Sequence, residues 1–231
     1  EENRGLEYMF IMMNAARFNV GMQGIAIADR AYQKAVRFAH DRTQSRDLAG
    51  SAGPVAIINH PDVKRMLLTM RAHVEGARAL AYVAAAASDA AHHATDASVQ
   101  AQNQAVYEYL VPVIKGFSTE MSIDMASLGV QVHGGMGYIE ETGAAQYLRD
   151  ARILTIYEGT TAIQANDLVG RKTLRDKGAV ARSLCDQIAI TEQDLAAHNN
   201  DDCNAMLDAL RQGRLALEKT IDFLVANGKI E

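Results

Sequence analysis

Two short motifs hold the residues of this chain that are best suited to chemistry. One is Ile156-Tyr157-Glu158-Gly159-Thr160-Thr161, and the other is Gln131-Val132-His133-Gly134-Gly135-Met136-Gly137-Tyr138. A carboxylate whose pKa is raised by burial can remove a proton as a general base. A cluster of glycines lets the backbone approach a ligand closely. Each motif is weak alone, because a glutamate also suits the start of a helix and a glycine pair also suits the end of one.

The elements that must position these motifs are predicted to be helices. Apolar residues recur at helical spacing from Leu6 onward, and this first helix is expected to run to about Arg46. Residues 47–59 include glycines and a proline and predict a loop. A second helix is expected from Pro61 to about Ala94, because proline suits the first helical position. The first two helices are therefore expected to be antiparallel.

A third apolar stripe covers residues 106–132, with Pro112 either kinking one helix or separating two. The glycine motif is expected to end this stripe. Thr142 is predicted to cap a short helix that runs to Arg152, and another helix is expected to start near Gly159. The two motifs are thus expected at helix ends.

Beyond Gly178, two more amphipathic helices are predicted, separated by a polar turn at residues 199–202. Abundant alanine, 6% aromatic residues and three prolines favour helices over a large sheet. The predicted fold class is all-α, an antiparallel four-helix bundle with additional C-terminal helices. The expected division places the bundle in residues 1–175 and a helical extension in residues 176–231.

Composition narrows the classes of partner. The net charge is −5, from 23 basic and 28 acidic side chains spread along the chain, which predicts no binding of nucleic acid. No apolar run reaches the roughly 20 residues of a membrane span. The two cysteines have no CxxC spacing and fit a reducing compartment, so a cytoplasmic location is expected. His92-His93 lacks further ligands nearby, so no metal site is predicted.

In this order and about two dozen residues apart, the two motifs resemble those of the acyl-CoA dehydrogenase family, in its C-terminal helical part. Residues 59–67 and the long tail resemble the larger bacterial subgroup that includes 3-methylmercaptopropionyl-CoA dehydrogenase. Two positions depart from the family pattern. Ser45-Arg46 stands where many members have Phe-Gly, and Ala162 stands where a glutamine is common. The details of flavin packing are therefore left open.

By this resemblance the chain belongs to a flavoprotein oxidoreductase of fatty acid metabolism that converts an acyl-CoA thioester into its trans-2-enoyl-CoA. Glu158 would remove the substrate α-proton, while the β-hydrogen passes as hydride to N5 of FAD. Tyr157 and Gly159 are expected at the thioester, where the backbone N–H of Glu158 would help to bind the carbonyl oxygen. Arg17 matches an arginine near the entrance for the CoA or the acyl part of the substrate.

The cofactor contacts follow from the same resemblance. Arg42 and Gln44 match residues that contact the FAD of a neighbouring subunit. Arginine suits this role because its planar guanidinium can bind pyrophosphate oxygens with two hydrogen bonds. The positions that match contacts to the nucleotide portion and the flavin are Gln131, Gly134, Gly135 and Thr160.

The resemblance also implies a homodimer or homotetramer, with electron-transfer flavoprotein as the electron acceptor. The family places a helical domain and a β-domain before this region. The chain opens with Glu1-Glu2-Asn3-Arg4 and contains neither domain, so we expect a fragment that is inactive alone. Two alternatives remain open. An acyl-CoA oxidase would keep the base and pass electrons to oxygen, whereas a non-catalytic helical oligomerisation module would have lost catalysis.

Overall fold

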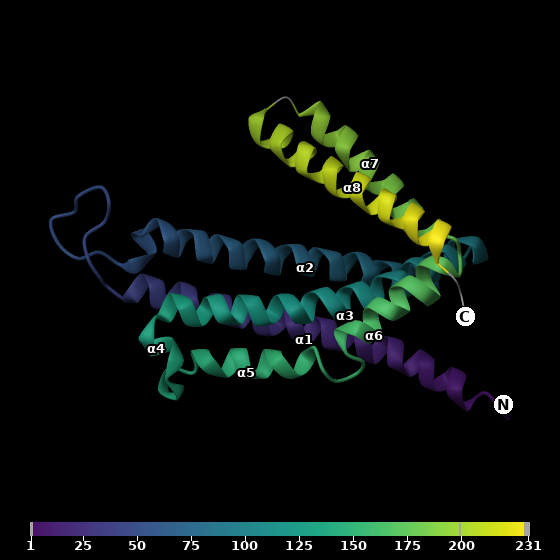
Figure 1. Ribbon diagram of the computed structural model, residues 1–231, viewed down its shortest axis with the longest axis horizontal. Helices are drawn as coiled ribbons and strands as arrows, with labels where there is room; N and C mark the ends of the chain where they lie inside the picture. Colours follow the sequence, from purple (N-terminus) through teal and green to yellow (C-terminus); the bar gives the residue numbers. More distant parts are fainter. Residues whose placement is uncertain (1, 199, 229–231) are drawn as a thin grey trace.

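The computed structural model describes residues 2–198 and 200–228, most of which lie in helices (Figure 1). Four helices form a bundle in which consecutive members run in opposite directions: α1 (Gly5–Asp41), α2 (Pro61–His93), α3 (Ala97–His133) and the shorter α5 (Ala144–Leu154). The other elements are η1 (Ile57–Asn59), α4 (Gly135–Tyr138), η2 (Glu140–Thr142), α6 (Thr161–Asn166), the π-helical η3 (Asp167–Leu174), α7 (Ala179–Ala197) and α8 (Asp201–Asn227). The predicted all-α class is confirmed.

Helix α3 lies at the centre of the bundle and contacts α1, α2, α5 and α6. Two glycines of α1 set its distance from α3. A Cβ added to Gly21 would lie 2.6 Å from Cγ2 of Ile114, and one added to Gly24 would lie 2.6 Å from the carbonyl oxygen of Ser118. The two helices therefore approach so closely at this point that a side chain on either glycine would clash.

The main core lies between α1, α2 and α3. Helix α1 contributes alanines at spacings of three and four, which place them on one helix face. Longer methionine side chains from α2 and α3 fill the space beside these small residues. The buried residues of this core include Ala28, Ala31, Ala35, Ala39, Met66, Met70, Met121 and Met125.

The first helix ends earlier than predicted. Helix α1 stops at Asp41 instead of about Arg46, because the next residues pair with the segment before α2. The carbonyl oxygen of Arg42 accepts from the N–H of Ile57 at 2.8 Å, and Thr43 forms an isolated antiparallel bridge with Ala56. The third helix continues through Pro112, so the alternative in which one helix ends there is wrong.

The short elements also differ in detail from the prediction. Gly143, in the left-handed conformation, is the N-cap of α5, whereas the hydroxyl of Thr142 donates to the carbonyl oxygen of Met136 at 2.6 Å. Helix α6 begins at Thr161, two residues later than expected, because Thr160 provides the cap. Periodicity located these helices, but local hydrogen bonds set their ends.

Helices α7 and α8 form an antiparallel hairpin that joins one end of the bundle and diverges from α2 toward its tip (Figure 1). Glu192 of α7 is buried and accepts two hydrogen bonds from Arg214 of α8, at 2.6 and 2.9 Å. These contacts lower the pKa of Glu192. Asn199, at the predicted turn, lies outside the described residues. The domain boundary at residue 175 stays a prediction.

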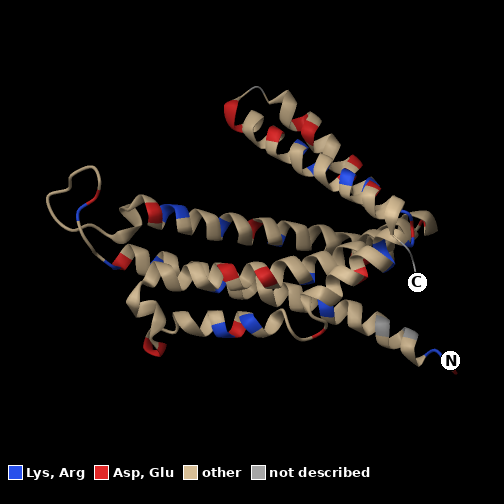
Figure 2. Cartoon of the chain, in the orientation of Figure 1, with Lys and Arg blue, Asp and Glu red and all other residues tan. Residues whose placement is uncertain are grey.

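Charged side chains of both signs are interspersed along the long helices (Figure 2). Within residues 2–198 and 200–228, no helix is both long and apolar enough to cross a membrane. The two motifs expected to form the site lie at helix ends, one between α3 and α4 and the other between α5 and α6.

Candidate active site

The turn between α5 and α6 presents Glu158 at the surface of the bundle. Glu158 has a φ of 54° and Gly159 a φ of 87°, so two successive residues adopt the left-handed conformation. This conformation costs a residue with a Cβ roughly 1–2 kcal/mol. The side chain of Glu158 is exposed. The expected burial of this carboxylate is therefore not produced by this chain alone, because the turn lies on the outside of the bundle.

Two buried side chains hold the backbone of this turn. Lys115 of α3 donates from Nζ to the carbonyl oxygens of Leu154, at 2.8 Å, and Gly159, at 2.6 Å. Gln164 of α6 donates from Nε2 to the carbonyl oxygens of Gly159, at 3.1 Å, and Glu158, at 3.4 Å. Lys115 is 0% exposed and Gln164 is 2% exposed. The conformation of the turn is thus fixed from inside the bundle.

Other side chains attach the same turn to the long helices. The hydroxyl of Tyr157 donates to the side-chain oxygen of Gln23, in the middle of α1. Thr161 donates its hydroxyl to the carboxylate of Glu120 on α3, at 2.5 Å. The turn that carries Glu158 is therefore held on two sides by helices that also form the core.

Thr160 lies two residues after Glu158 and combines two roles. Its hydroxyl oxygen accepts a long hydrogen bond, 3.4 Å, from the backbone N–H of Ile163 and so caps α6. Thr160 also lines a cavity of about 460 Å³, a size typical of the smaller ligand pockets. Arg152 and Ile156 line the same cavity. A ligand group in this cavity would lie beside the turn that carries Glu158.

Lys115 also affects the charge around the turn. Burial lowers the pKa of its ammonium group, and the nearby Arg17 cation lowers it further, whereas Glu120 and Glu158 act in the opposite direction. An ammonium group in such a place is stabilised by the two carbonyl oxygens that it contacts. The negative charge of Glu158 at the surface also favours the charged form of this buried ammonium group.

The glycine motif lies at the end of α3. Gln131, Gly134 and Gly135 are exposed, and Gly134 has a φ of 59°. A Cβ added to Gly135 would meet nothing within 4 Å, so the packing of this chain does not require a glycine there. A Cβ added to Gly137 would lie 2.3 Å from the carbonyl oxygen of Val130. Gly137 is therefore explained by packing, whereas Gly135 leaves an open stretch of backbone.

His133 precedes these glycines and is buried. Its ring stacks on Phe38 of α1 with a centroid distance of 4.4 Å, and Nδ1 donates to the carbonyl oxygen of Gly129 at 2.7 Å. Burial lowers the pKa of His133, and the Lys34 cation also lowers it, while the Gly129 contact acts in the opposite direction. The folded chain therefore disfavours protonation of the His133 ring.

This packing predicts an acid-dependent loss of stability. Below a pH of about 6.5 the unfolded histidine binds a proton that the folded histidine, with its lowered pKa, does not. The free energy of unfolding therefore falls by at most about 1.4 kcal/mol for each pH unit below this value, until the folded histidine is protonated as well. In His133→Phe, which keeps a ring against Phe38, this part of the pH dependence is expected to disappear. Urea unfolding at pH 8, 6.5 and 5.5 measures it.

His92 provides a matched control for this prediction. Its Nδ1 contacts the carbonyl oxygen of Ser88, four residues earlier, at 2.7 Å, but the side chain is exposed. His92→Phe should therefore keep the pH dependence of the unmodified chain. An equal change in both variants would contradict the role given to His133.

Arg42 and Gln44 lie near the glycine motif and far from Glu158. The stacking of Phe38 on His133 brings the end of α1 to the end of α3. The Arg42 side chain is exposed just beyond the end of α1. Gln44 is also exposed, and its carbonyl oxygen lies 2.7 Å from Nε2 of His60. These two residues and the glycine motif share one end of the bundle.

The structure thus separates the expected site residues into two groups. Tyr157 meets α1 at Gln23, whereas the glycine motif meets α1 near Phe38, and these two places are roughly 22 Å apart at 1.5 Å per helical residue. Of the residues expected at FAD, only Thr160 lies in the turn that carries Glu158. Arg42, Gln44, Gln131, Gly134 and Gly135 lie at the distant end.

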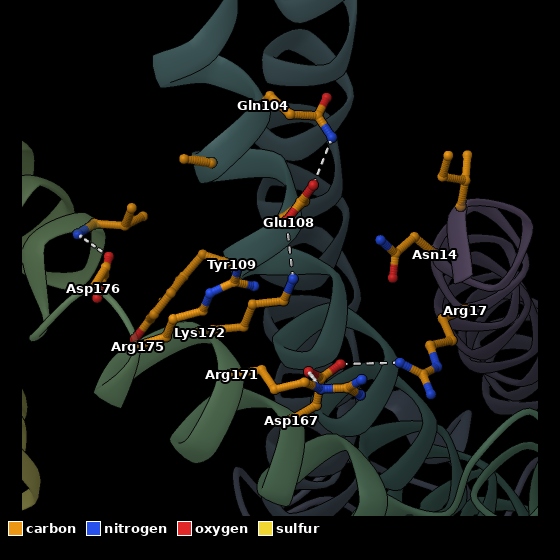
Figure 3. A pocket seen from close by; sticks show the side chains of 13 residues that line it. Asn14, Arg17, Gln104, Glu108, Tyr109, Asp167, Arg171, Lys172, Arg175 and Asp176 are labelled. Atoms are coloured by element: carbon orange, nitrogen blue, oxygen red, sulfur yellow. Dashed lines mark hydrogen bonds and ion pairs between the residues drawn. The ribbon is translucent and has the colours of Figure 1, made fainter. Parts of the chain in front are cut away.

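Arg17 is buried, whereas a residue that meets substrate at an entrance would be expected to be exposed. Its Nη1 forms an ion pair with Asp167 at 3.0 Å, and both side chains are 4% exposed. The Nε atom has no hydrogen-bond partner. Arg17 also lines a cavity of about 850 Å³ together with Arg171, Lys172 and Arg175 (Figure 3). The cavity therefore combines a structural ion pair with several cationic groups.

Sequence reasoning missed four residues that hold the turn: Gln23, Lys115, Glu120 and Gln164. One signal was present, because Lys115 is the single charged residue in the otherwise uncharged run from Leu110 to Phe117. The other three residues carried no such signal, because their partners lie far away in the sequence.

Comparison with known proteins gives a consistent result. Residues 3–173 match the family model described as "Acyl-CoA dehydrogenase, C-terminal domain". The chain is 55% identical over 227 residues to 3-methylmercaptopropionyl-CoA dehydrogenase of Ruegeria pomeroyi, covering 98% of this chain and 38% of that protein. It is 38% identical over 196 residues to the broad-specificity linear acyl-CoA dehydrogenase FadE5 of Mycobacterium tuberculosis, covering 81% of this chain and 32% of that protein. The chain thus spans about a third of the length of these relatives.

Solved structures show the same fold. Butyryl-CoA dehydrogenase from Megasphaera elsdenii superposes with a TM-score of 0.59 at 25% identity, over 74% of this chain and 39% of that chain. Caenorhabditis elegans ACDH-11 in complex with C11-CoA gives a TM-score of 0.72 at 22% identity, over 98% of this chain and 37% of that chain. The second match extends across the α7–α8 hairpin, so the hairpin is part of a known fold.

Proposed function

The chain belongs to the acyl-CoA dehydrogenase family, as its C-terminal domain, and from that membership we propose that it supplies the catalytic base and part of the FAD site of an acyl-CoA dehydrogenase. Glu158 is the proposed base. The reaction removes one hydrogen from the α-carbon and one from the β-carbon of an acyl-CoA thioester and leaves a trans-2-enoyl-CoA.

The conformation of Glu158 carries this proposal. A glutamate with a φ of 54° is strained, and a glycine would adopt the same conformation without that cost. Thr160, not Glu158, caps α6. In the described part of the chain the Glu158 carboxylate forms no hydrogen bond or ion pair, and its one electrostatic interaction, with Lys115, does not require the strained conformation. Strain kept in an exposed acidic residue is typical of a functional position.

The residues of this chain fit an FAD group. The exposed backbone at Gly134 and Gly135 leaves room for a nucleotide, and the exposed amide of Gln131 can bind its polar atoms. Thr160 offers a hydroxyl beside Glu158 for the flavin end. From the family resemblance we propose that Arg42 and Gln44, which lie about 22 Å from Glu158, serve the FAD of a neighbouring subunit.

The chain's own part in the reaction is to take the proton. The Glu158 carboxylate accepts the α-proton, and the electron pair of that C–H bond forms the new double bond. When bound, FAD supplies the acceptor for the β-hydrogen and its two electrons. The backbone N–H of Glu158 stabilises charge on the thioester oxygen, and Tyr157 and Gly159 border the reacting carbons. Another domain of the enzyme would cover Glu158 and exclude water, which makes its carboxylate a stronger base.

The cavity at Arg17 is the proposed place for an anionic part of CoA. It is lined by four cations, and three of them already pair with carboxylates: Arg17 and Arg171 with Asp167, and Lys172 with Glu108 at 3.1 Å. Arg175 adds a further exposed cation. Arg17 is therefore proposed to contribute to substrate binding from a buried position, where its ion pair with Asp167 holds one wall of this cavity.

The complete enzyme is proposed to be a cytoplasmic homodimer or homotetramer that contains further domains before residue 1. Electron-transfer flavoprotein is the proposed acceptor of electrons. One relative, 29% identical, is named as a subunit of a caffeyl-CoA reductase-Etf complex of Acetobacterium woodii, which supports this choice of partner.

The test is anaerobic reduction of the flavin in the full-length enzyme that carries this chain. We expect an acyl-CoA to bleach the flavin absorbance, and comparison of short, branched, thioether-containing and long acyl-CoAs will identify the preferred substrate. Bleaching followed by fast release of peroxide in air would favour an acyl-CoA oxidase. A protein that cannot be loaded with FAD would favour the non-catalytic oligomerisation module.

A further inference from the structure

Lys115 is a buried cation in the middle of α3. It is 0% exposed and is the largest of the fully buried side chains. Within the described part of the chain it forms no ion pair, and its two hydrogen-bond acceptors are backbone carbonyl oxygens. Burial of an ammonium group is costly and lysine is rarely fully buried. A cation at this position therefore requires an explanation beyond packing.

The two acceptors of Lys115 are the two ends of the turn that carries Glu158. The carbonyl of Leu154 belongs to the last turn of α5, where a helix leaves such groups without partners. The carbonyl of Gly159 directly follows the glutamate. Because one Nζ atom contacts both oxygens, these oxygens can be no farther apart than the sum of the two distances, 2.8 and 2.6 Å. Lys115 therefore holds together the two ends of the segment that contains residues 155–158.

Closure of the turn determines the direction of Glu158. With both ends fixed, the chain must reverse over few residues, and Glu158 and Gly159 do so in the left-handed conformation. Gln164 reinforces the same carbonyl groups from the side of α6. The carboxylate is thereby directed away from the bundle, while the backbone that carries it stays attached to the core.

We propose that Lys115 is a positioning residue that holds Glu158 in its reactive orientation by joining the two ends of this turn. The proposal rests on the proposed function of Glu158 as the base. It gives Lys115 no contact with the substrate and no transfer of a proton.

The experiment uses Lys115→Met in the full-length, FAD-loaded enzyme, since methionine has a similar length and no donor. We expect the rate of anaerobic flavin reduction to fall by roughly 10²-fold, because a small displacement of a catalytic group has effects of that size. FAD content and the Kd of the acyl-CoA should change by less than about threefold, since neither depends on the base. Lys219→Met on the exposed face of α8 is the matched control and should keep the wild-type rate.

A double-mutant cycle separates positioning from a general structural role. If Lys115 acts through Glu158, Lys115→Met should slow residual flavin reduction by less than about threefold when Glu158→Gln is already present. Loss of the same factor in both backgrounds would show that Lys115 acts elsewhere. An unchanged rate in the single variant would overturn the proposal directly.

Gln164→Leu provides a second route if Lys115→Met does not fold. The Oε1 atom of Gln164 has no partner, so leucine removes only the contacts to the turn. We expect a smaller loss of rate than in Lys115→Met, again absent when Glu158→Gln is present. Full activity in this variant would contradict the view that carbonyl contacts position the base.

Amide hydrogen exchange tests the closure of the turn without using catalysis. Exchange at residues 156–161 should be faster in Lys115→Met than in the unmodified protein, while α2 should be unaffected. If no acyl-CoA reduces the flavin of the unmodified enzyme, the proposed function fails, and this measurement still decides whether Lys115 holds the turn. Unchanged exchange at residues 156–161 would overturn the proposal.

Discussion

Replacing Glu158 with glutamine is expected to slow flavin reduction by acyl-CoA by roughly 10²–10⁴-fold, which is the usual contribution of a general base. The amide has nearly the shape of the carboxylate but cannot accept the α-proton. Because the Glu158 side chain is exposed and its carboxylate forms no hydrogen bond or ion pair in the described part of the chain, its replacement should leave the fold and FAD binding unchanged. Single-turnover measurements in the full-length enzyme provide the rate.

Glu75→Gln is a suitable control for this change. Glu75 is an exposed glutamate on α2 that forms a surface ion pair with Arg71 at 2.8 Å. Such pairs contribute little to stability, so this variant should reduce its flavin at the wild-type rate. If Glu158→Gln retained FAD and remained within threefold of the wild-type rate, another group would have to be the base.

Replacing Gly24 with alanine is expected to destabilise the bundle by about 1–3 kcal/mol. The new Cβ would lie 2.6 Å from the carbonyl oxygen and 2.9 Å from the carbonyl carbon of Ser118. Both are backbone atoms of α3, so the helices must separate to make room. Alanine favours the helix by roughly 1 kcal/mol over glycine, and the observed loss is what remains after that gain. Urea unfolding followed by circular dichroism measures the change.

Gly76→Ala tests whether the contact with α3, and not the loss of a glycine, causes the effect. Gly76 lies in the interior of α2, and a Cβ there would meet nothing within 4 Å. This variant should be more stable than the unmodified chain by roughly 0.5–1 kcal/mol. Destabilisation of both variants by similar amounts would mean that the close approach of α1 and α3 is not the reason for Gly24.

The helices could be predicted from the sequence because each has an apolar face with a regular period. Helix α2 was predicted within one residue at its end, Pro61 to about Ala94 against His93. The end of α1 was placed too late, because Arg42 and Thr43 pair with Ile57 and Ala56. A pairing between segments on either side of a loop leaves no mark in the period of a helix.

The candidate site was only partly predictable. The family resemblance pointed to Glu158, and no helical pattern did. The contacts that hold its turn join residues 39 and 44 positions apart, from Lys115 to Leu154 and Gly159. Their acceptors are carbonyl oxygens, which every residue has, so no residue type marks them. The separation of Arg42 from Glu158 likewise depends on helix lengths and directions, which only the folded bundle shows.

The hold of Lys115 and Gln164 on the turn does not depend on which side chains the turn displays. Their acceptors are main-chain atoms that remain after almost any substitution at Ile156, an exposed residue that lines the cavity beside Thr160. Mutations at such a position can alter what the cavity accepts while the base stays in place. Under the proposed function, substitutions at Ile156 can therefore change which thioesters the enzyme prefers without moving the proposed base.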